Sequence, residues 1–204
     1  MKIPILPLPL QGMRFKGNRD YLHGTDVLPA ALHALASERS LEGMRDIDIV
    51  FHALARTGLT LCESLPHSRE PRAQISCTID GTRHKFLLVE DGRPVTDRQT
   101  YPEEQIVAAT TIDVPAKAAS SSAPLPFTNI ERWIAMIKAL HHAVYPDARG
   151  KWLFARAKLA TYTETQMSTV NHMVCIESDF GGKLTRSGLV IDGRRIGDIY
   201  FALA

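Results

Sequence analysis

Residues 14–35 of this 204-residue chain read RFKGNRDYLHGTDVLPAALHAL. The first part is polar and has the character of an edge strand. His23 and Gly24 can form a sharp turn, and the residues after them place apolar side chains at helical spacing. The stretch therefore predicts a strand over 13–22, a turn, and a short helix that buries one apolar face.

Two helix starts can be recognised. In the first helix, Thr25 or Asp26 can act as the N-cap by accepting hydrogen bonds from the free backbone N–H groups of the first turn. In the second, Thr128 is followed three residues later by Glu131, the spacing of a capping box. Apolar residues then recur at helical spacing over 130–140, which predicts a helix that packs on a sheet.

The rest of the chain is typical of strands and tight turns. Alternation of apolar and polar residues and β-branched content predict strands at 47–53, 73–79, 83–90, 106–114, 152–162, 170–178, 183–191 and 194–203. Residues 59–65 either extend the first of these strands or form another one. Asp-Gly pairs at 80–81, 91–92 and 192–193 favour hairpin turns, because both positions accept a positive φ. The Gly-Gly pair at 181–182 favours another turn.

The second half repeats the layout of the first. The matching segments are Thr25-Asp26-Val27 with Thr128-Asn129-Ile130, Phe51 with Phe154, Cys77 with Cys175, and Asp91-Gly92 with Asp192-Gly193. The helix starts are offset by 103 residues and the last turns by 101. We therefore predict one unit over 1–114 with an extended N-terminal arm, an Ala/Ser/Pro-rich linker over 115–126, and the rest of a second unit over 127–204, whose first strand lies near 106–114.

An amphipathic helix followed by an antiparallel meander must bury its apolar stripe on one sheet face. This order of elements resembles the hot-dog fold, an α+β arrangement in which an antiparallel sheet wraps around a central helix. Two tandem units resemble the double hot-dog proteins over nearly the whole chain. Such proteins mostly act on acyl thioesters of coenzyme A or acyl carrier protein, as dehydratases, thioesterases or isomerases.

The resemblance implies particular catalytic residues. Hydroxyacyl-thioester dehydratases have a histidine just before the central helix, and the run from His23 to Pro29 resembles that segment, with two residues fewer. His23 would then be the base. Its ring pKa lies near 6.5 when unperturbed, which suits proton transfer. The acid expected further along this helix is absent, which leaves Asp20 and Glu131 as candidate partners. For Glu131 the alternative is the capping box alone.

The resemblance also suggests where substrate would bind. The first N–H groups of a helix carry partial positive charge, so Gly24 and Thr25 would face a thioester carbonyl and stabilise charge on its oxygen. Arg194 and Arg195, at a predicted hairpin tip, could meet a coenzyme A phosphate or an acidic carrier protein; otherwise they are solvated. A hot-dog thioesterase would instead show an aspartate before a Gly-His-Val-Asn-like turn. Asp20 followed by His23 and Gly24 is only partly similar to that pattern, because the glycine and the histidine are in reversed order.

Composition narrows the remaining classes. The net charge of +2 is too small for a nucleic-acid surface, and three cysteines without a CxxC spacing favour a reducing, cytoplasmic location. No apolar run approaches the roughly 20 residues that cross a bilayer, and the proline-broken start does not resemble a signal peptide. No pair of histidines has metal-site spacing and no glycine loop binds phosphate. We expect no metal and no cofactor apart from the coenzyme A or phosphopantetheine that carries the substrate.

These observations predict an acyl-thioester enzyme of fatty acid or polyketide metabolism, more similar to a 3-hydroxyacyl dehydratase, a lyase, than to an acyl thioesterase. Its partners would be acyl-CoA or acyl carrier protein, and it could form a homodimer. The presence of the histidine in only one half implies one site per chain. Because the helix acid is missing, a non-catalytic hot-dog module that binds an acyl chain or a partner protein is the alternative.

Overall fold

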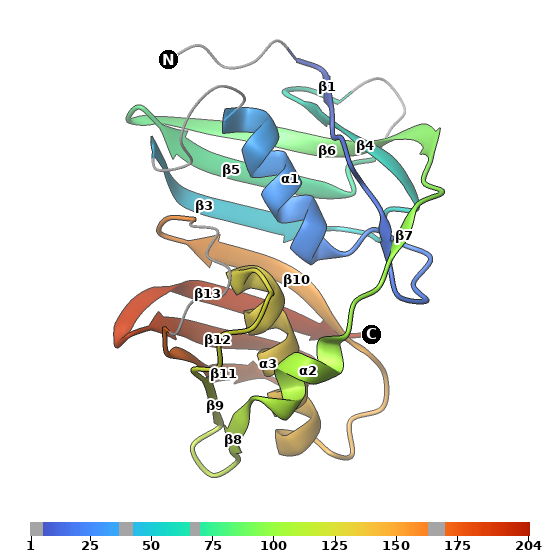
Figure 1. The fold of residues 1–204 in the computed structure, drawn as a ribbon. Helices are drawn as coiled ribbons and strands as arrows, with labels where there is room; N and C mark the ends of the chain where they lie inside the picture. The colour runs from blue at the N-terminus through green and yellow to red at the C-terminus, as the bar shows by residue number, and fades with distance from the viewer. Residues whose placement is uncertain (1–5, 37–42, 66–69, 163–169) are drawn as a thin grey trace. The chain divides into compact units, whose positions relative to one another are not determined.

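The fold is seen in a computed structural model that describes residues 6–36, 43–65, 70–162 and 170–204 (Figure 1). The chain divides into two compact units, Met1–Tyr101 and Pro102–Ala204. Part of the predicted N-terminal arm (residues 1–5) lies outside the described residues.

The first unit is an antiparallel sheet with one long helix. Its elements are β1 (Leu8–Pro9), β2 (Phe15–Lys16), α1 (Gly24–Ala36), β3 (Met44–Phe51), β4 (Thr57–Cys62), β5 (Ala73–Ile79), β6 (Thr82–Pro94) and β7 (Arg98–Gln99). The strands lie in the order β1-β4-β6-β5-β3, and β2 pairs separately with β7 in parallel. Figure 1 shows α1 lying across one face of this sheet.

The strand periodicity of this unit determines its core. Every second residue of β5, from Ala73 to Ile79, is at most 2% exposed, as the alternation predicted. The predicted turn at 80–81 joins β5 to β6, with φ of 48° at Asp80 and 78° at Gly81. The apolar side chains of α1, including Leu28, Leu32 and Leu35, are buried in the same core.

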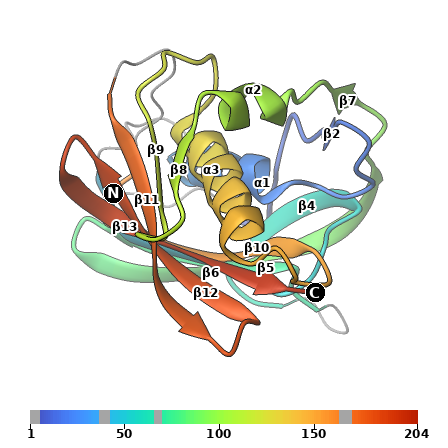
Figure 2. The ribbon, with the colours of Figure 1, turned by 90° about the horizontal axis from the view of Figure 1, so that it is seen from below.

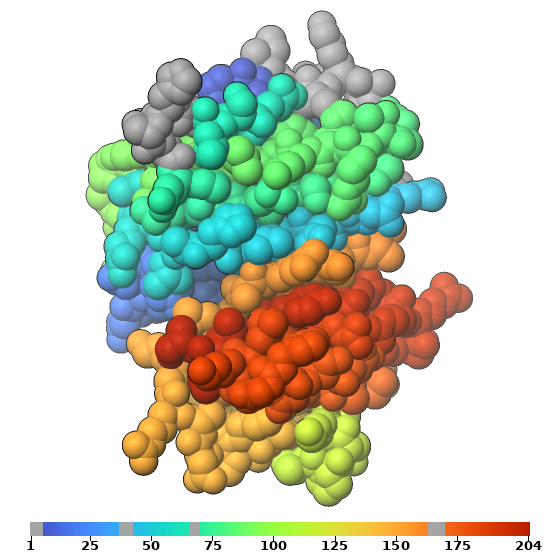
Figure 3. Space-filling model, turned by 180° about the vertical axis from the view of Figure 1, so that it is seen from behind, coloured from blue at the N-terminus to red at the C-terminus, as the bar shows by residue number. Residues whose placement is uncertain are grey.

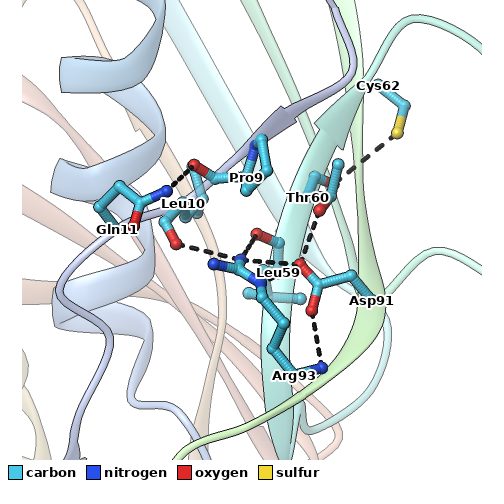
Figure 4. A network of polar contacts seen from close by, with 8 residues as sticks. All are labelled: Pro9, Leu10, Gln11, Leu59, Thr60, Cys62, Asp91 and Arg93. Atoms are coloured by element: carbon cyan, nitrogen blue, oxygen red, sulfur yellow. Dashed lines mark hydrogen bonds and ion pairs between the residues drawn. The ribbon is translucent and has the colours of Figure 1, made fainter.

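The described part of the N-terminal arm is attached to the sheet. β1 pairs with β4, and the Nη2 group of Arg93 donates to the carbonyl oxygens of Leu10 and Leu59, both at 3.2 Å (Figure 4). Asp91 accepts from Arg93 and from the Thr60 hydroxyl, each at 2.7 Å. These bonds connect the arm, β4 and β6 at one end of the sheet.

The second unit is a larger antiparallel sheet around a central helix. It contains α2 (Glu103–Ala108), β8 (Thr111–Asp113), β9 (Ala118–Ser121), α3 (Asn129–Val144), β10 (Trp152–Leu159), β11 (His172–Phe180), β12 (Leu184–Ile191) and β13 (Arg194–Leu203). The strand order is β10-β13-β12-β11-β9-β8. Figure 2 shows the sheet curving around α3, and Figure 3 shows β12 and β13 from the outer side.

The predicted fold class is confirmed in both units: each has an antiparallel sheet packed around a central helix. The capping box at the start of α3 is present, since Thr128 accepts from the Glu131 backbone N–H and the Glu131 carboxylate accepts from that of Thr128. The turns at 181–182 and 192–193 are confirmed as hairpins, with positive φ at all four positions.

Several local predictions are wrong. The strand over 13–22 is reduced to β2, because the chain turns at Gly17. α1 begins at Gly24, and the His23 carbonyl accepts from the N–H groups of Asp26 and Val27, so neither Thr25 nor Asp26 is the N-cap. Asp91 and Gly92 lie inside β6 instead of forming a hairpin turn.

The segment between the two units' central helices also differs from the prediction. Residues 103–108 form α2 instead of a strand; Glu103 and Glu104 favour a helix start, and Ile106 is buried. Only 111–113 is strand, as β8. The segment predicted as a linker, 115–126, contains β9, which pairs with β8 and β11 and buries Ala119 and Ser121. The small side chains of β9 pack against α3, so this segment is partly buried despite its low hydrophobicity.

The internal repeat holds for the order of elements but not for the strand pairing or for the match of Cys77 with Cys175. In the first unit, β3 pairs with β5, the third strand after the helix. In the second, β10 pairs with β13, the fourth strand after the helix. Cys77 therefore lies beside β3, whereas Cys175 lies in β11 between β9 and β12. The two cysteines are not structural equivalents.

Candidate functional site

His23 lies immediately before α1 and is 7% exposed. Its Nδ1 atom is 2.7 Å from the Thr25 hydroxyl oxygen. The contact is local, because His23 and Thr25 are two residues apart at the start of α1. It holds the ring beside the N-terminus of α1, the end of a helix at which the first backbone N–H groups lack intrahelical partners.

A buried lysine completes the surroundings of His23. Lys16 is 1% exposed, and its Nζ atom donates to Thr25 Oγ1 at 2.8 Å and pairs with Asp26 Oδ1 at 2.7 Å. The same atom lies 4.5 Å from the centre of the Tyr101 ring, which is 5.9 Å from the His23 ring. A cation, an imidazole, a hydroxyl and a carboxylate are thus gathered at the start of α1.

The short parallel pair of β2 and β7 positions Lys16. Arg98, in β7, donates to the carbonyl oxygens of Gly17 and Arg19, and its guanidinium lies 5.5 Å from the Phe15 ring centre. These contacts hold the turn that follows Lys16, so its side chain points inward. Lys16 and Tyr101 were not identified from the sequence; the available signal was a lysine in a segment with the character of an edge strand.

The predicted acidic partners of His23 are placed differently. Asp20 has a side chain that is 76% exposed, and its carboxylate is 3.3 Å from Nε of Arg56. Glu131 is occupied at the capping box, where its Oε2 atom accepts from the Thr128 backbone N–H at 2.9 Å and from the Thr128 hydroxyl at 2.8 Å. In the structure, Asp20 therefore forms a surface ion pair with Arg56, and Glu131 caps the start of α3.

Of the predicted substrate-binding residues, Gly24 is the first residue of α1, and Thr25 is buried against Lys16 and His23. Arg194 is exposed near the turn between β12 and β13. Arg195 pairs with Glu177 and Asp198, and hydrogen bonding to Glu177 is the main cause that raises its pKa. Arg195 is therefore part of a surface ion-pair network.

Two histidines that the sequence gave no reason to single out are fully buried in the second unit. His141 in α3 donates from Nδ1 to the Ile137 carbonyl oxygen at 2.6 Å, and its Nε2 atom is 2.6 Å from Thr185 Oγ1. His172 in β11 accepts from the Trp133 indole at 3.1 Å. Burial is the largest cause that lowers the pKa of each to about 4, so both are neutral near pH 7.

Two further properties bear on the predicted function. Within the described residues, no group of three or more His, Cys, Asp or Glu side chains is arranged to hold a metal ion. The helices of the described segments are all too short or too polar to cross a membrane.

Comparison with known proteins defines the class of fold. The protein has the double hot-dog fold, with two hot-dog units in one chain. A similar structure is the dehydratase domain of PpsC from Mycobacterium tuberculosis in complex with C12:1-CoA, with TM-score 0.54, 11% identity, and coverage of 90% of this chain and 85% of that one. Another is the tesB protein MAP1729c of Mycobacterium avium subs paratuberculosis, with TM-score 0.50, 10% identity, and coverage of 95% and 91%. No protein-family model matches the sequence, and no curated protein matches it either.

Proposed function

We propose that the protein is an acyl-thioester enzyme of the 3-hydroxyacyl dehydratase type, with His23 as its proton-transfer residue. The observation that carries the proposal is the buried imidazole at the start of α1, held through Thr25 by the buried Lys16. A histidine in this position can exchange a proton with a substrate whose carbonyl is bound by the first N–H groups of the helix.

A single histidine can complete the elimination. The Nε2 atom of His23 removes the α-proton of a 3-hydroxyacyl thioester, and the charge that develops on the thioester oxygen is stabilised at the helix start. The C–O bond at the β-carbon then breaks, the α,β double bond forms, and the proton on Nε2 goes to the departing hydroxyl to give water. This scheme does not need Asp20 or Glu131, which have other contacts in the structure.

The scheme requires a particular tautomer of His23. A hydroxyl oxygen can accept two hydrogen bonds, so Thr25 can accept one from Lys16 and one from an N–H on Nδ1 of His23. The Nε2 atom is then unprotonated and can act as a base. If Thr25 instead donates to Nδ1, Nε2 carries the proton, which is what we expect of a non-catalytic module. The ¹⁵N chemical shifts of the His23 ring distinguish these two states.

Activity is tested with a 3-hydroxyacyl-CoA, chosen because the similar PpsC dehydratase domain was solved with a coenzyme A ester. His23→Ala should lower kcat/KM by roughly 10²–10⁴-fold, the usual cost of losing a general base. His33→Ala, an exposed histidine on the same helix, is the matched control and should retain wild-type activity. Carrier-protein thioesters and release of free thiol, which reports thioesterase activity, are measured in parallel.

A non-catalytic module that binds acyl chains is the second candidate, and the exposed position of Asp20 favours it. It predicts that the wild type binds an acyl-CoA without turning it over. Equal activity of the wild type and His23→Ala, or no turnover of any thioester by the wild type, would make this candidate the better account.

A further inference from the structure

A buried arginine in the second unit has no carboxylate partner in the described part of the chain. Arg132, the fourth residue of α3, is 1% exposed. Its Nη2 group donates to the Ala123 carbonyl oxygen at 2.8 Å, and within the described residues its Nε group has no hydrogen-bond partner. Burial lowers its pKa. A buried charge is costly unless it is paired, so this guanidinium is suited to an anion.

Two neutral donors lie in the same region. The His172 ring accepts at Nδ1 from Trp133, so the proton of the neutral ring is on Nε2. The Nε2 atom of His172 and the Oγ atom of Ser121 are both buried and have no partner among the residues described.

The strand register and the contacts of α3 bring these groups together. Ser121 in β9 lies directly opposite His172 in β11, so their side chains leave the sheet on the same face. That face is the one toward α3, because His172 contacts Trp133 of that helix. Arg132 is next to Trp133, and its guanidinium bonds to the chain two residues beyond Ser121. The positive charge of Arg132 also acts on the His172 ring.

We propose that Arg132, His172 and Ser121 form a binding site for a carboxylate group, inside the second unit and separate from His23. All three side chains offer hydrogen-bond donors, which suits a ligand group that only accepts. The site holds one positive charge, since His172 is neutral, and a buried monoanion matches that charge whereas a phosphate dianion would exceed it. This site goes beyond the proposed dehydratase function and does not rest on it.

The test uses acetate as the probe, on the full chain at pH 7.5, with thermal unfolding followed by tryptophan fluorescence. Saturating sodium acetate should raise the Tm of the wild type by about 3 °C or more above that in sodium chloride of equal concentration. Arg132→Met, which keeps the length and removes the charge, should abolish this increase. Its Tm in chloride should equal or exceed that of the wild type, because an unpaired buried charge has been removed.

Ser121→Ala provides a second variant if Arg132→Met does not fold. It should leave the Tm in chloride near that of the wild type and raise the acetate concentration for half-maximal effect about tenfold, the loss of one hydrogen bond to a charged group. Equal effects of acetate and chloride on the wild type would overturn the proposal. So would an undiminished acetate effect in either variant, or a larger effect of inorganic phosphate than of acetate.

Discussion

The two buried histidines of the second unit should make its stability depend on pH between 7 and 4. The pKa of both His141 and His172 is lowered from 6.5 to about 4, with burial as the largest cause. His142 adds to the lowering for His141 and Asp179 opposes it; for His172, Arg132 adds and Asp192 opposes. As the pH falls below 6.5, the unfolded chain takes up protons at both rings and the folded chain does not. Stability is therefore present above 6.5 and lost as the pH falls.

The size of the effect follows from the shift. Each unit of pKa difference corresponds to about 1.4 kcal/mol, so each histidine contributes up to about 3 kcal/mol that is lost by pH 4. Above pH 5 the depressed carboxylates contribute little, since the pKa of Asp91, for example, is about 2. The interval from pH 7 to 5 therefore reports mainly on the histidines.

Urea unfolding at pH 7.5, 6.5, 5.5 and 5.0 measures this dependence. Both tryptophans of the chain, Trp133 and Trp152, lie in the second unit, and each contacts one of the two histidines, so fluorescence follows the relevant unfolding. His141→Asn and His172→Asn keep a neutral group at the Nδ1 position, and each should remove about half of the slope. An unfolding free energy that is constant from pH 7.5 to 5.0 in the wild type, or an undiminished slope in the double variant, would refute the argument.

Two further predictions concern the capping box and the arm. Glu131→Gln should change both turnover and the free energy of unfolding only slightly, because the amide oxygen still accepts from the Thr128 backbone N–H. Thr128→Ala should instead lower the free energy of unfolding, measured with urea, by about 1 kcal/mol. A large rate loss in Glu131→Gln would instead identify Glu131 as the catalytic acid. Burial disfavours the charged form of Asp91, but bonds from Arg93 and Thr60 outweigh it and hold its pKa at about 2. Asp91→Asn should weaken the attachment of β1 and destabilise the first unit by about 1 kcal/mol; circular dichroism during urea unfolding measures this, and an unchanged midpoint would contradict it.

The local elements followed closely from the sequence. β5 and β13 have the predicted bounds, and α3 starts where the capping box placed it. Such features depend on neighbours within a few residues, which the sequence displays directly. The predictions failed in two segments. Residues 103–113 contain α2 and then the short strand β8, where one longer strand over 106–114 was predicted. Residues 118–121 form β9, whose small side chains pack against α3.

The candidate site was only partly predictable. His23 was identified from its position before a helix, and that position is where the structure has it. Asp20 was chosen for its closeness in sequence, yet a turn carries its side chain to the surface beside Arg56. Closeness along the chain does not determine the direction of a side chain in an irregular segment.

By itself, the sequence predicted that each unit has a helix followed by a meander of three or four strands, because helical and strand periodicities are local properties of the chain. Tertiary structure alone decided that β3 pairs with β5 while β10 pairs with β13, since the same alternation of residues is compatible with either neighbour. It also decided that Lys16 and Tyr101 surround His23 and that Arg132 is buried without a carboxylate among the described residues. The physical reason is that charge pairing and burial depend on which distant segments meet in space.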